Sequence, residues 1–368
     1  MEIEIGKLIK KAKLIRCGDG EYPVLSMTMH DGLMFQNDRF KKQIASVDQS
    51  QYQVVQRHQL VESFPIDEGV LAVQELTDAG IVSPAYKIWD VDMEKVVPKY
   101  LEFALRAPKS IEYYKFKLRG TTARRRSIPD AEFCAMRIKC PSLDEQKIIV
   151  DTIEKTKRVI DSRNLELDTL DDLIKARFVE MFGTPYRNEK GFPMKSVDDV
   201  IEFVGGAQPD KKYFEYAPTD NNIRLIQIRD YKTDNYVTYI PKSMAKRFCD
   251  VDDIMIGRYG PPIFQILKGI EGSYNVALMK ATPKMGNKEF IRYFLKQDCL
   301  FNYLDGLSQR TAGQSGIEMS ALKAYPFPYP PPELQNQFAD FVHQVDKSKL
   351  LVQKSLDETQ VLFNSLMQ

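Results

Sequence analysis

One stretch of the chain, residues 142–183, constrains the fold more strongly than any other part of the sequence. It opens on Ser142 with Glu145 three residues later, the pattern of a capping box, in which each side chain bonds a free backbone N–H of the first turn. It closes on Gly183 followed by Pro185, residue types that end helices. The sequence therefore predicts one helix over this range. At about 1.5 Å per residue it would be roughly 60 Å long, too long to be buried in one compact domain.

Apolar residues recur along this predicted helix in alternating steps of four and three, which is the period of a coiled-coil seam. Thr156 and Arg163 interrupt the seam with polar side chains. A helix with a single apolar seam needs a partner helix to cover it. The predicted seam residues are Ile149, Ile153, Ile160, Leu167, Leu170 and Ile174.

The partner is predicted at the C-terminal end of the sequence, because the chain contains an internal repeat. A shift of 189 positions places Pro141 on Pro330 and Gln146 on Gln335, with more identities than chance would give. The seam carries over, and short interruptions at different places favour two unlike helices packing on each other. In this second helix the predicted seam residues are Phe338, Val342, Val345, Val352, Leu356 and Phe363.

Each long helix follows a region of mixed character, which indicates an α+β fold. Runs such as EYPVLSMTMHDG and DIMIGRYG have the pattern of strands, whereas KVVPKYLEFALRAP and FIRYFLKQDCLFNYL have helical spacing. We expect four parts along the chain, with the last long helix pairing with the first: residues 1–140, 141–183, 184–329 and 330–368.

Composition and motifs exclude several classes of protein. No apolar run is long enough to span a membrane, and the N-terminal MEIEIGKLIK lacks the apolar core of a signal peptide. The 5 cysteines form no CxxC pair, and with only 3 histidines they give no zinc-ligand spacing, so we expect reduced thiols in a cytoplasmic protein without a metal site. No phosphate-binding loop or glycine-rich strand-turn-helix motif occurs, so we expect no catalytic residues in this chain.

Basic and amide side chains gather in two polar loops that the repeat places at equivalent positions. Arg and Gln make bidentate contacts to base edges, and small residues let backbone N–H groups reach phosphates, so these loops are candidates for DNA contacts. Any one of these residues could instead be part of a solvated loop. The candidates are Thr122, Arg124, Arg125 and Arg126 in the first loop, Gln309, Arg310 and Gln314 in the second, and Lys211, Lys212 and Arg258 outside the loops.

With these features, the chain resembles the specificity subunit of type I restriction-modification enzymes over essentially its whole length. The most specific matches are PSLDEQ at 141–146 with ARFVEMFG at 176–183, and PPPELQNQF at 330–338 with NSLM at 364–367. These segments are similar to the central and distal conserved regions of that family. YPVLSMT and GIVSPAY in the first part look like segments of its target-recognition domains.

The resemblance implies two α/β target-recognition domains separated by an antiparallel coiled coil of two long helices. Each domain would read one half of a bipartite sequence in double-stranded DNA, with an unread spacer between the halves. The implied protein partners are two methyltransferase subunits, which bind S-adenosylmethionine and methylate adenine at N6, and restriction subunits, which use ATP and Mg. This chain would bind none of these cofactors and catalyse neither reaction.

Two other interpretations stay open at this stage. The chain could be a coiled-coil adaptor without direct DNA readout, which a DNA-binding experiment with the methyltransferase partner would distinguish. It could also be a stand-alone DNA methyltransferase, which would need a methyl-donor fold that the sequence does not show. Tight binding of S-adenosylmethionine by the isolated chain would favour that interpretation.

Overall fold

The computed structural model describes residues 2–29, 31–39, 48–118, 126–260, 262–308 and 316–368. By its internal contacts the chain divides into two compact units. Unit 1 comprises Met1–Asn164 with Gln353–Gln368, and unit 2 comprises Leu165–Val352. Both long helices contribute residues to each unit. The four-part division expected from the sequence therefore stays a prediction about segments of the chain.

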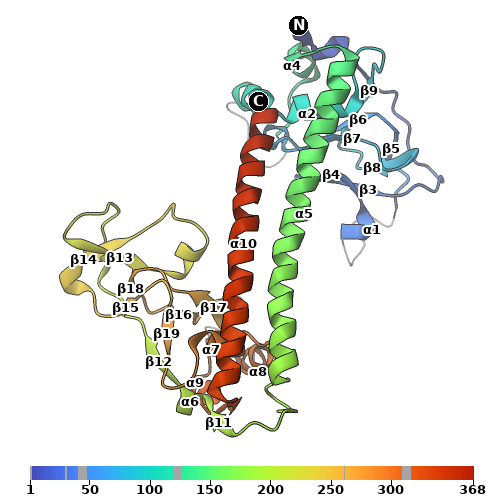
Figure 1. Ribbon diagram of the computed structural model, residues 1–368. Helices are drawn as coiled ribbons and strands as arrows, with labels where there is room; N and C mark the ends of the chain where they lie inside the picture. The colour runs from blue at the N-terminus through green and yellow to red at the C-terminus, as the bar shows by residue number, and fades with distance from the viewer. Residues whose placement is uncertain (1, 30, 40–47, 119–125, 261, 309–315) are drawn as a thin grey trace. The chain divides into compact units, whose positions relative to one another are not determined.

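Each unit contains a four-stranded antiparallel sheet, and the strand order is the same in both (Figure 1). In unit 1 the order is β2 (Ile9–Lys11), β9 (Lys87–Val91), β6 (Leu60–Glu62) and β7 (Leu71–Val73). In unit 2 it is β12 (Ile201–Gly205), β19 (Leu278–Pro283), β16 (Ile254–Gly257) and β17 (Gln265–Lys268). The identical non-sequential order shows that the repeat seen in the sequence is a repeat of the fold.

A second layer of strands also follows one plan in both units. In unit 2 it is a sheet in the order β14 (Tyr239–Pro241), β13 (Asn222–Ile226), β18 (Gly272–Tyr274) and β15 (Phe248–Cys249), with β13 and β18 parallel. In unit 1 the corresponding pairs are β3 (Leu25–Thr28) with β4 (Gly32–Phe35) and β5 (Gln53–Gln56) with β8 (Ala79–Val82). The single parallel bridge between Val24 and Ile81 joins these pairs at the place of the β13–β18 pairing.

The first sheet of each unit is covered on both faces, which explains its short continuous apolar strands. Along β16, Ile254 and Ile256 face the core that contains the helices, whereas Met255 between them faces the second sheet. Along β6, Leu60 faces the helices and Val61 faces the second layer of strands. Successive side chains of a strand point to opposite faces, so apolar residues can follow one another along a strand whose two faces are both covered.

The helices and short edge strands complete the repeat. Unit 1 has α2 (Pro98–Arg106), α3 (Pro108–Lys117), α4 (Asp130–Ala135), and the pair β1 (Glu2–Glu4) with β10 (Arg137–Lys139). Unit 2 has α7 (Lys288–Leu295), α8 (Asp298–Ser308), α9 (Met319–Ala324), and the pair β11 (Met194–Ser196) with β20 (Pro326–Pro328). The remaining short elements are η1 (Ile5–Lys7), α1 (Gln36–Arg39), η2 (Ile66–Glu68), α6 (Val197–Val200), η3 (Lys211–Tyr213), η4 (Ile228–Tyr231) and η5 (Lys242–Met244).

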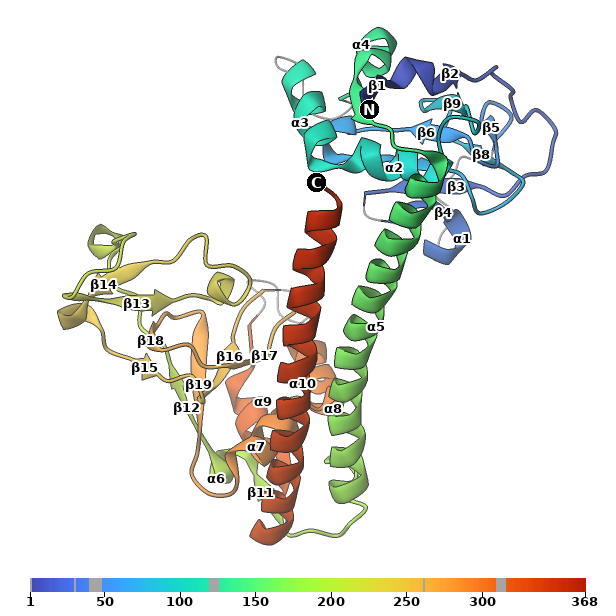
Figure 2. The ribbon, with the colours of Figure 1, turned by 45° about the horizontal axis from the view of Figure 1, so that its top comes forward.

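The two long helices are α5 (Leu143–Phe182) and α10 (Pro332–Leu366), in agreement with the predicted coiled coil. The capping box forms as predicted, since the Ser142 N–H donates to Glu145 Oε2 at 2.9 Å, and Gly183 ends the helix with a φ of 72°. In unit 2, Phe182 of α5 packs on Phe338 of α10, and Asp171 of α5 pairs with Lys349 of α10. The residue numbers therefore decrease along α5 in the direction in which they increase along α10. The helices are therefore antiparallel in this unit (Figure 2).

Both long helices are fixed to their units by a buried glutamine in the first turn. The Gln146 side chain accepts from the Val97 N–H at 2.8 Å and donates to the Pro141 carbonyl at 2.9 Å. The Gln335 side chain accepts from the Asn287 N–H at 2.8 Å and donates to the Pro330 carbonyl at 2.7 Å. Val97 and Asn287 are the N-cap residues of α2 and α7, so the repeat extends to individual hydrogen bonds.

Candidate DNA interface

The residues selected from the sequence fall into a helix seam and a set of candidate DNA contacts. Thr122, Arg124, Arg125, Gln309, Arg310 and Gln314 lie outside the described residues. Arg126, Lys211, Lys212 and Arg258 are described, and the residues that flank both loops are described as well. The positions of the flanking residues decide where each loop leaves its unit.

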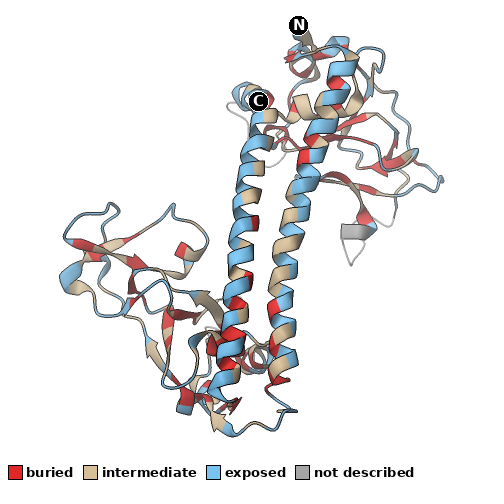
Figure 3. Cartoon of the chain, in the orientation of Figure 1, coloured by how far each residue is buried: buried red, intermediate tan, exposed pale blue. Residues whose placement is uncertain are grey.

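Buried residues recur on one side of each long helix at the seam positions (Figure 3). Ile153, Ile174, Phe338, Val342, Val345 and Val352 are buried, and Ile149, Ile160, Leu167, Leu170, Leu356 and Phe363 are half-buried. Two polar residues at seam positions, Thr156 of α5 and Lys349 of α10, have partners. Thr156 Oγ1 donates to the Thr152 carbonyl at 2.8 Å, and Lys349 Nζ lies 2.6 Å from Asp171 Oδ1.

In unit 1, Arg126 is the one candidate of the first basic loop that the structure describes, and it contacts the connection between β6 and β7. The Ile66 N–H, in the connection between β6 and β7, donates to the Arg126 carbonyl at 3.1 Å. The Arg126 guanidinium pairs with Asp67 at 2.8 Å and with Glu68 at 3.0 Å. Arg126 is therefore bonded to its own unit, and its charge is already neutralised by two carboxylates of that unit.

The chain that follows the second loop is paired at the equivalent place in unit 2. Gly316, the first described residue after the loop, forms an antiparallel bridge with Tyr259 in the connection between β16 and β17. Strands β16 and β17 are the counterparts of β6 and β7. Both basic loops therefore end at the same sheet connection within their own units, as the repeat in the sequence indicates.

A basic cleft of 350 Å³ opens beside this connection in unit 1. It lies between the segment that follows β2 and the segment that precedes β9, which are joined where the Ala12 N–H donates to the Ile88 carbonyl at 3.0 Å. Tyr86 lines the cleft, and its ring packs edge-on against Phe64 at 5.7 Å, next to η2. The lining includes Lys11, Lys13, Arg16 and Lys87, and among the described residues that line it there is no Asp or Glu.

Some of these cations are held by the fold and others are available to a ligand. Lys87 pairs with Glu62 and Asp130, both at 3.0 Å, and Lys11 also pairs with Asp130. Burial raises the pKa of Glu62, and the positive charge of Lys87 opposes this rise only in part. The exposed Lys13 forms no ion pair within the described part of the chain. We therefore regard Lys13 as the cation of this cleft best placed for a phosphate.

In unit 2 the corresponding place carries Arg258 and the two lysines predicted from the sequence. The Gly206 N–H donates to the Leu278 carbonyl at 3.0 Å, in the same way that Ala12 bonds Ile88 in unit 1. Beside this junction the Arg258 guanidinium donates to the Val276 carbonyl at 3.3 Å and lies 5.2 Å from the Tyr259 ring. The segment that follows Gly206 leads into η3, where Lys211 and Lys212 are exposed.

Sequence reasoning missed part of this surface. Lys13 and Arg16, which line the cleft of unit 1, were not predicted as DNA contacts. In unit 2 the ring of Tyr236 is 63% exposed and lies 6.0 Å from the Arg229 guanidinium, and exposed aromatic rings near cations are suited to stacking on nucleic-acid bases. The concentration of cations in KKAKLIR, which begins within β2, is the signal that could have identified the unit 1 cleft.

Two further observations concern other kinds of site. Across the described ranges, no helix has the length and apolar character needed to cross a membrane. The described His, Cys, Asp and Glu residues form no cluster of three or more that could hold a metal ion.

Comparison with known proteins was made for the sequence and for the structure. Residues 189–359 match the family model described as the type I restriction modification DNA specificity domain. The S subunit of a type I restriction-modification system from M. genitalium has the same fold, with a TM-score of 0.57 and 13% identity over 100% of this chain and 94% of that one. A chain from a study of complex assembly and conformational transition of the type I R-M system has a TM-score of 0.59 and 16% identity, over 100% and 96% of the two chains.

Proposed function

Because residues 189–359 of this chain belong to the family of type I restriction modification DNA specificity domains, we propose that it is the DNA-specificity subunit of a type I restriction-modification system. In this proposal the chain binds a bipartite target in double-stranded DNA, and each unit reads one half. It has no catalytic role of its own. The observation that carries the proposal is the repetition of the same basic edge, next to the same sheet connection, in both units.

The chemistry of this edge suits a nucleic acid. Lysine and arginine side chains position a duplex through its phosphates, whereas loops with Arg, Gln and small residues can reach base edges. In unit 1 the cleft lies beside the sheet connection that Arg126 contacts, and in unit 2 Arg258 is next to Tyr259 at the equivalent connection, so backbone contacts and base contacts could be made by one continuous surface in each unit. Different side chains on the same scaffold would give the two units different half-sites.

The proposal includes partners that supply the reactions. Two methyltransferase subunits would bind S-adenosylmethionine and methylate adenine, and restriction subunits would use ATP and Mg, while this chain binds none of these cofactors. The buried seams of α5 and α10 support a scaffolding role, because they hold long helices whose remaining faces are exposed, such as Ile148 and Leu350 at 66% and 71%. We expect the chain to act in the cytoplasm, and its 5 cysteines are free thiols.

The test measures DNA affinity as a function of salt, using the chain assembled with its methyltransferase partner. Replacing Lys211 and Lys212 by alanine should weaken binding and reduce the slope of log K against log salt by about 1 to 2, because each phosphate contact contributes about 0.9. The matched control replaces Lys190 and Lys288, which are also exposed lysines of unit 2 but lie outside η3. An unchanged slope for the first variant would remove η3 from the interface.

Measurements of DNA affinity and of S-adenosylmethionine binding distinguish the alternative functions. If the assembled complex shows no DNA affinity beyond that of the methyltransferase alone, the chain is an adaptor and the proposal fails. If the isolated chain binds S-adenosylmethionine tightly, it is an enzyme in its own right. Sequence-specific binding that requires this chain would support the specificity role.

A further inference from the structure

Both walls of the basic cleft in unit 1 are fixed to Gln53 of β5. On the wall that follows β2, the Arg16 backbone pairs with Gln53 in an antiparallel bridge. On the other wall, Gln53 Nε2 donates to the Pro84 carbonyl at 3.1 Å and to the Tyr86 carbonyl at 2.7 Å. Gln53 is 8% exposed, so these bonds are made by a buried amide. The cleft is therefore ordered before a ligand binds, and binding costs little conformational freedom.

An exposed leucine projects from one of these walls. Leu14 lines the cleft and is 54% exposed. The backbone is bonded on both sides of it, because the Ala12 N–H donates to the Ile88 carbonyl at 3.0 Å and the Val54 N–H donates to the Ile15 carbonyl at 2.8 Å. The side chain of Leu14 is therefore held at the surface, where its apolar area stays in contact with water until a ligand covers it.

Cations flank Leu14, and the other wall adds a second apolar residue. Lys13 is exposed, and Arg16 Nη1 donates to Gln51 Oε1 at 2.6 Å, which orients the guanidinium. Pro84 on the other wall is exposed as well. The described residues that line the cleft include no Asp or Glu. Charge complementarity therefore favours a polyanion, and the exposed Leu14 and Pro84 favour one that also has apolar faces.

Duplex DNA combines these two properties at every base step. Its phosphates lie on either side of the stacked bases, and the faces of the bases become accessible when a step is unstacked. Leucine and proline are among the side chains that DNA-binding proteins insert between base pairs, which kinks the duplex. The other use of an apolar side chain in DNA recognition is contact with a thymine methyl group. Apolar residues on both walls favour insertion, because a methyl group offers only one small surface.

We propose that unit 1 inserts Leu14 as a wedge between two adjacent base pairs of the bound DNA, with Lys13 and Arg16 on the neighbouring phosphates. The inference rests on the proposed function, since it requires DNA in this cleft. It adds that unit 1 selects its half-site in part by how readily a base step unstacks. Counted from the paired junctions at Ala12 and Gly206, unit 2 has Gln208 at the position of Leu14, so the wedge belongs to unit 1.

The experiment compares binding of the full chain to two DNA duplexes of about 24 base pairs, one fully paired and one with a single central mismatch. A mismatch lowers the free-energy cost of unstacking, so a protein with a wedge binds it more tightly. We expect the mismatched duplex to bind at least about fivefold more tightly, measured by fluorescence anisotropy at low salt. The methyltransferase is left out, because a protein that flips bases also favours a mismatch.

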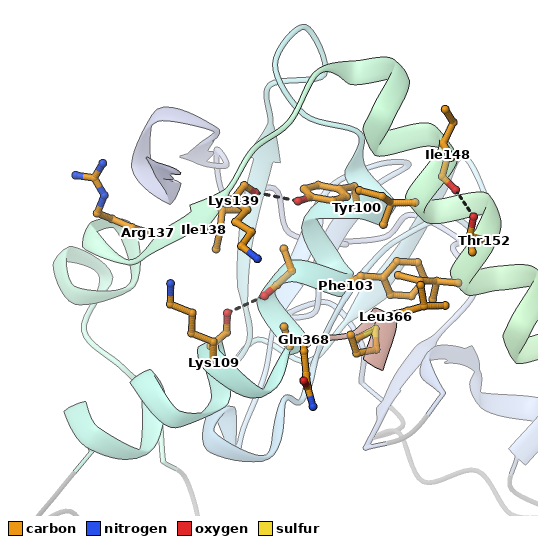
Figure 4. A pocket seen from close by; sticks show the side chains of 16 residues that line it. Tyr100, Phe103, Lys109, Arg137, Ile138, Lys139, Ile148, Thr152, Leu366 and Gln368 are labelled. Carbon is orange, nitrogen blue, oxygen red and sulfur yellow. Dashed lines mark hydrogen bonds between the residues drawn. The ribbon is translucent and has the colours of Figure 1, made fainter. Parts of the chain in front are cut away.

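Variants of exposed apolar residues test the role of Leu14. Leu14→Ala should reduce the preference for the mismatch to below about twofold, because the side chain that fills the opened step is lost. Leu14→Met retains a long apolar side chain and should retain the preference. The matched control is Ile148→Ala, which should behave as the unchanged chain does. Ile148 is 66% exposed in unit 1 and lines a different cavity, of 310 Å³, together with Lys109 and Lys139 (Figure 4).

Equal preference for the mismatch in the unchanged chain and in Leu14→Ala, or no preference in either, would overturn the inference. Replacing every thymine of the paired duplex by uracil removes the methyl groups. A loss of affinity on this replacement that is absent in Leu14→Ala would show that Leu14 contacts a methyl group, which would also overturn the wedge. If the assembled complex binds duplex DNA while the chain shows no preference for the mismatch, the inference fails and the proposed function stands.

Discussion

At the scale of single residues, Gln146 and Gln335 show how a polar side chain can define a fold. Both are fully buried, and both join the first turn of a long helix to the N-cap of a short one. A buried amide is stabilising only when its donor and acceptor groups have partners, and here each of them does. The identity of these residues in the repeat is therefore explained by hydrogen bonding.

Gln335→Leu should lower the free energy of unfolding of unit 2 by about 2–4 kcal/mol. The variant leaves the Asn287 N–H and the Pro330 carbonyl buried without partners, and each such group costs about 1–3 kcal/mol. Urea unfolding followed by circular dichroism measures the change. Gln337→Leu, an exposed position on the next turn, is the control and should change the stability by less than about 0.5 kcal/mol.

At the scale of elements, the same helical periodicity of apolar residues serves α5 both in its seam with α10 and in the core of unit 2. Near its C-terminal end, Ile174 and Phe178 belong to the large core of unit 2, together with α7 and the start of α10. Polar seam residues are tolerated because they bond locally or pair across the helices, as Thr156 and Lys349 do. The seam therefore specifies an antiparallel partner without being apolar at every position.

Ile174→Ala should destabilise unit 2 by about 2–5 kcal/mol, since Ile174 is fully buried and its removal leaves a cavity in the core. Leu173→Ala changes the neighbouring residue, which is 46% exposed, and should have a much smaller effect. Thermal unfolding of both variants provides the comparison. Similar losses of stability in the two variants would contradict the placement of Ile174 on the buried face of α5 and of Leu173 on its exposed face.

At the scale of the whole molecule, one structural plan occurs twice with different surface chemistry. The strand order of the first sheet is the same in both units, yet unit 1 carries Lys13 and Arg16 after β2 and unit 2 carries Lys211 and Lys212 in η3 after β12. Two similar scaffolds with different polar side chains can recognise different sequences. This is the physical basis for expecting a target in two unlike parts.

Mapping of methylated adenine in cells with and without the gene should reveal a motif made of two separated parts. Modification should disappear from both parts when the gene is absent, because the proposed subunit directs the methyltransferase. Exchange of unit 2 for that of a related protein should change one part of the methylated motif and leave the other part unchanged. A single contiguous motif would contradict the two-unit interpretation.

The sequence by itself determined the local features of this protein, because they depend on short-range spacing. The capping box at Ser142, the glycine stop at Gly183, the long helices and the repeat could all be predicted, and the α+β class with two similar halves was confirmed. The likeness to specificity subunits was confirmed by the comparisons. These features depend on residue types a few positions apart, or on identities between two segments of the sequence.

Only the tertiary structure decided which distant residues meet. It showed that Arg126 pairs with Asp67 and Glu68, that Gln146 and Gln335 bond N-cap residues far away in sequence, and that Phe182 packs on Phe290 and Phe338. Such contacts depend on the path of the chain between the residues. Neither periodicity nor composition contains that information, so the cleft and the cavity could be found only in the folded molecule.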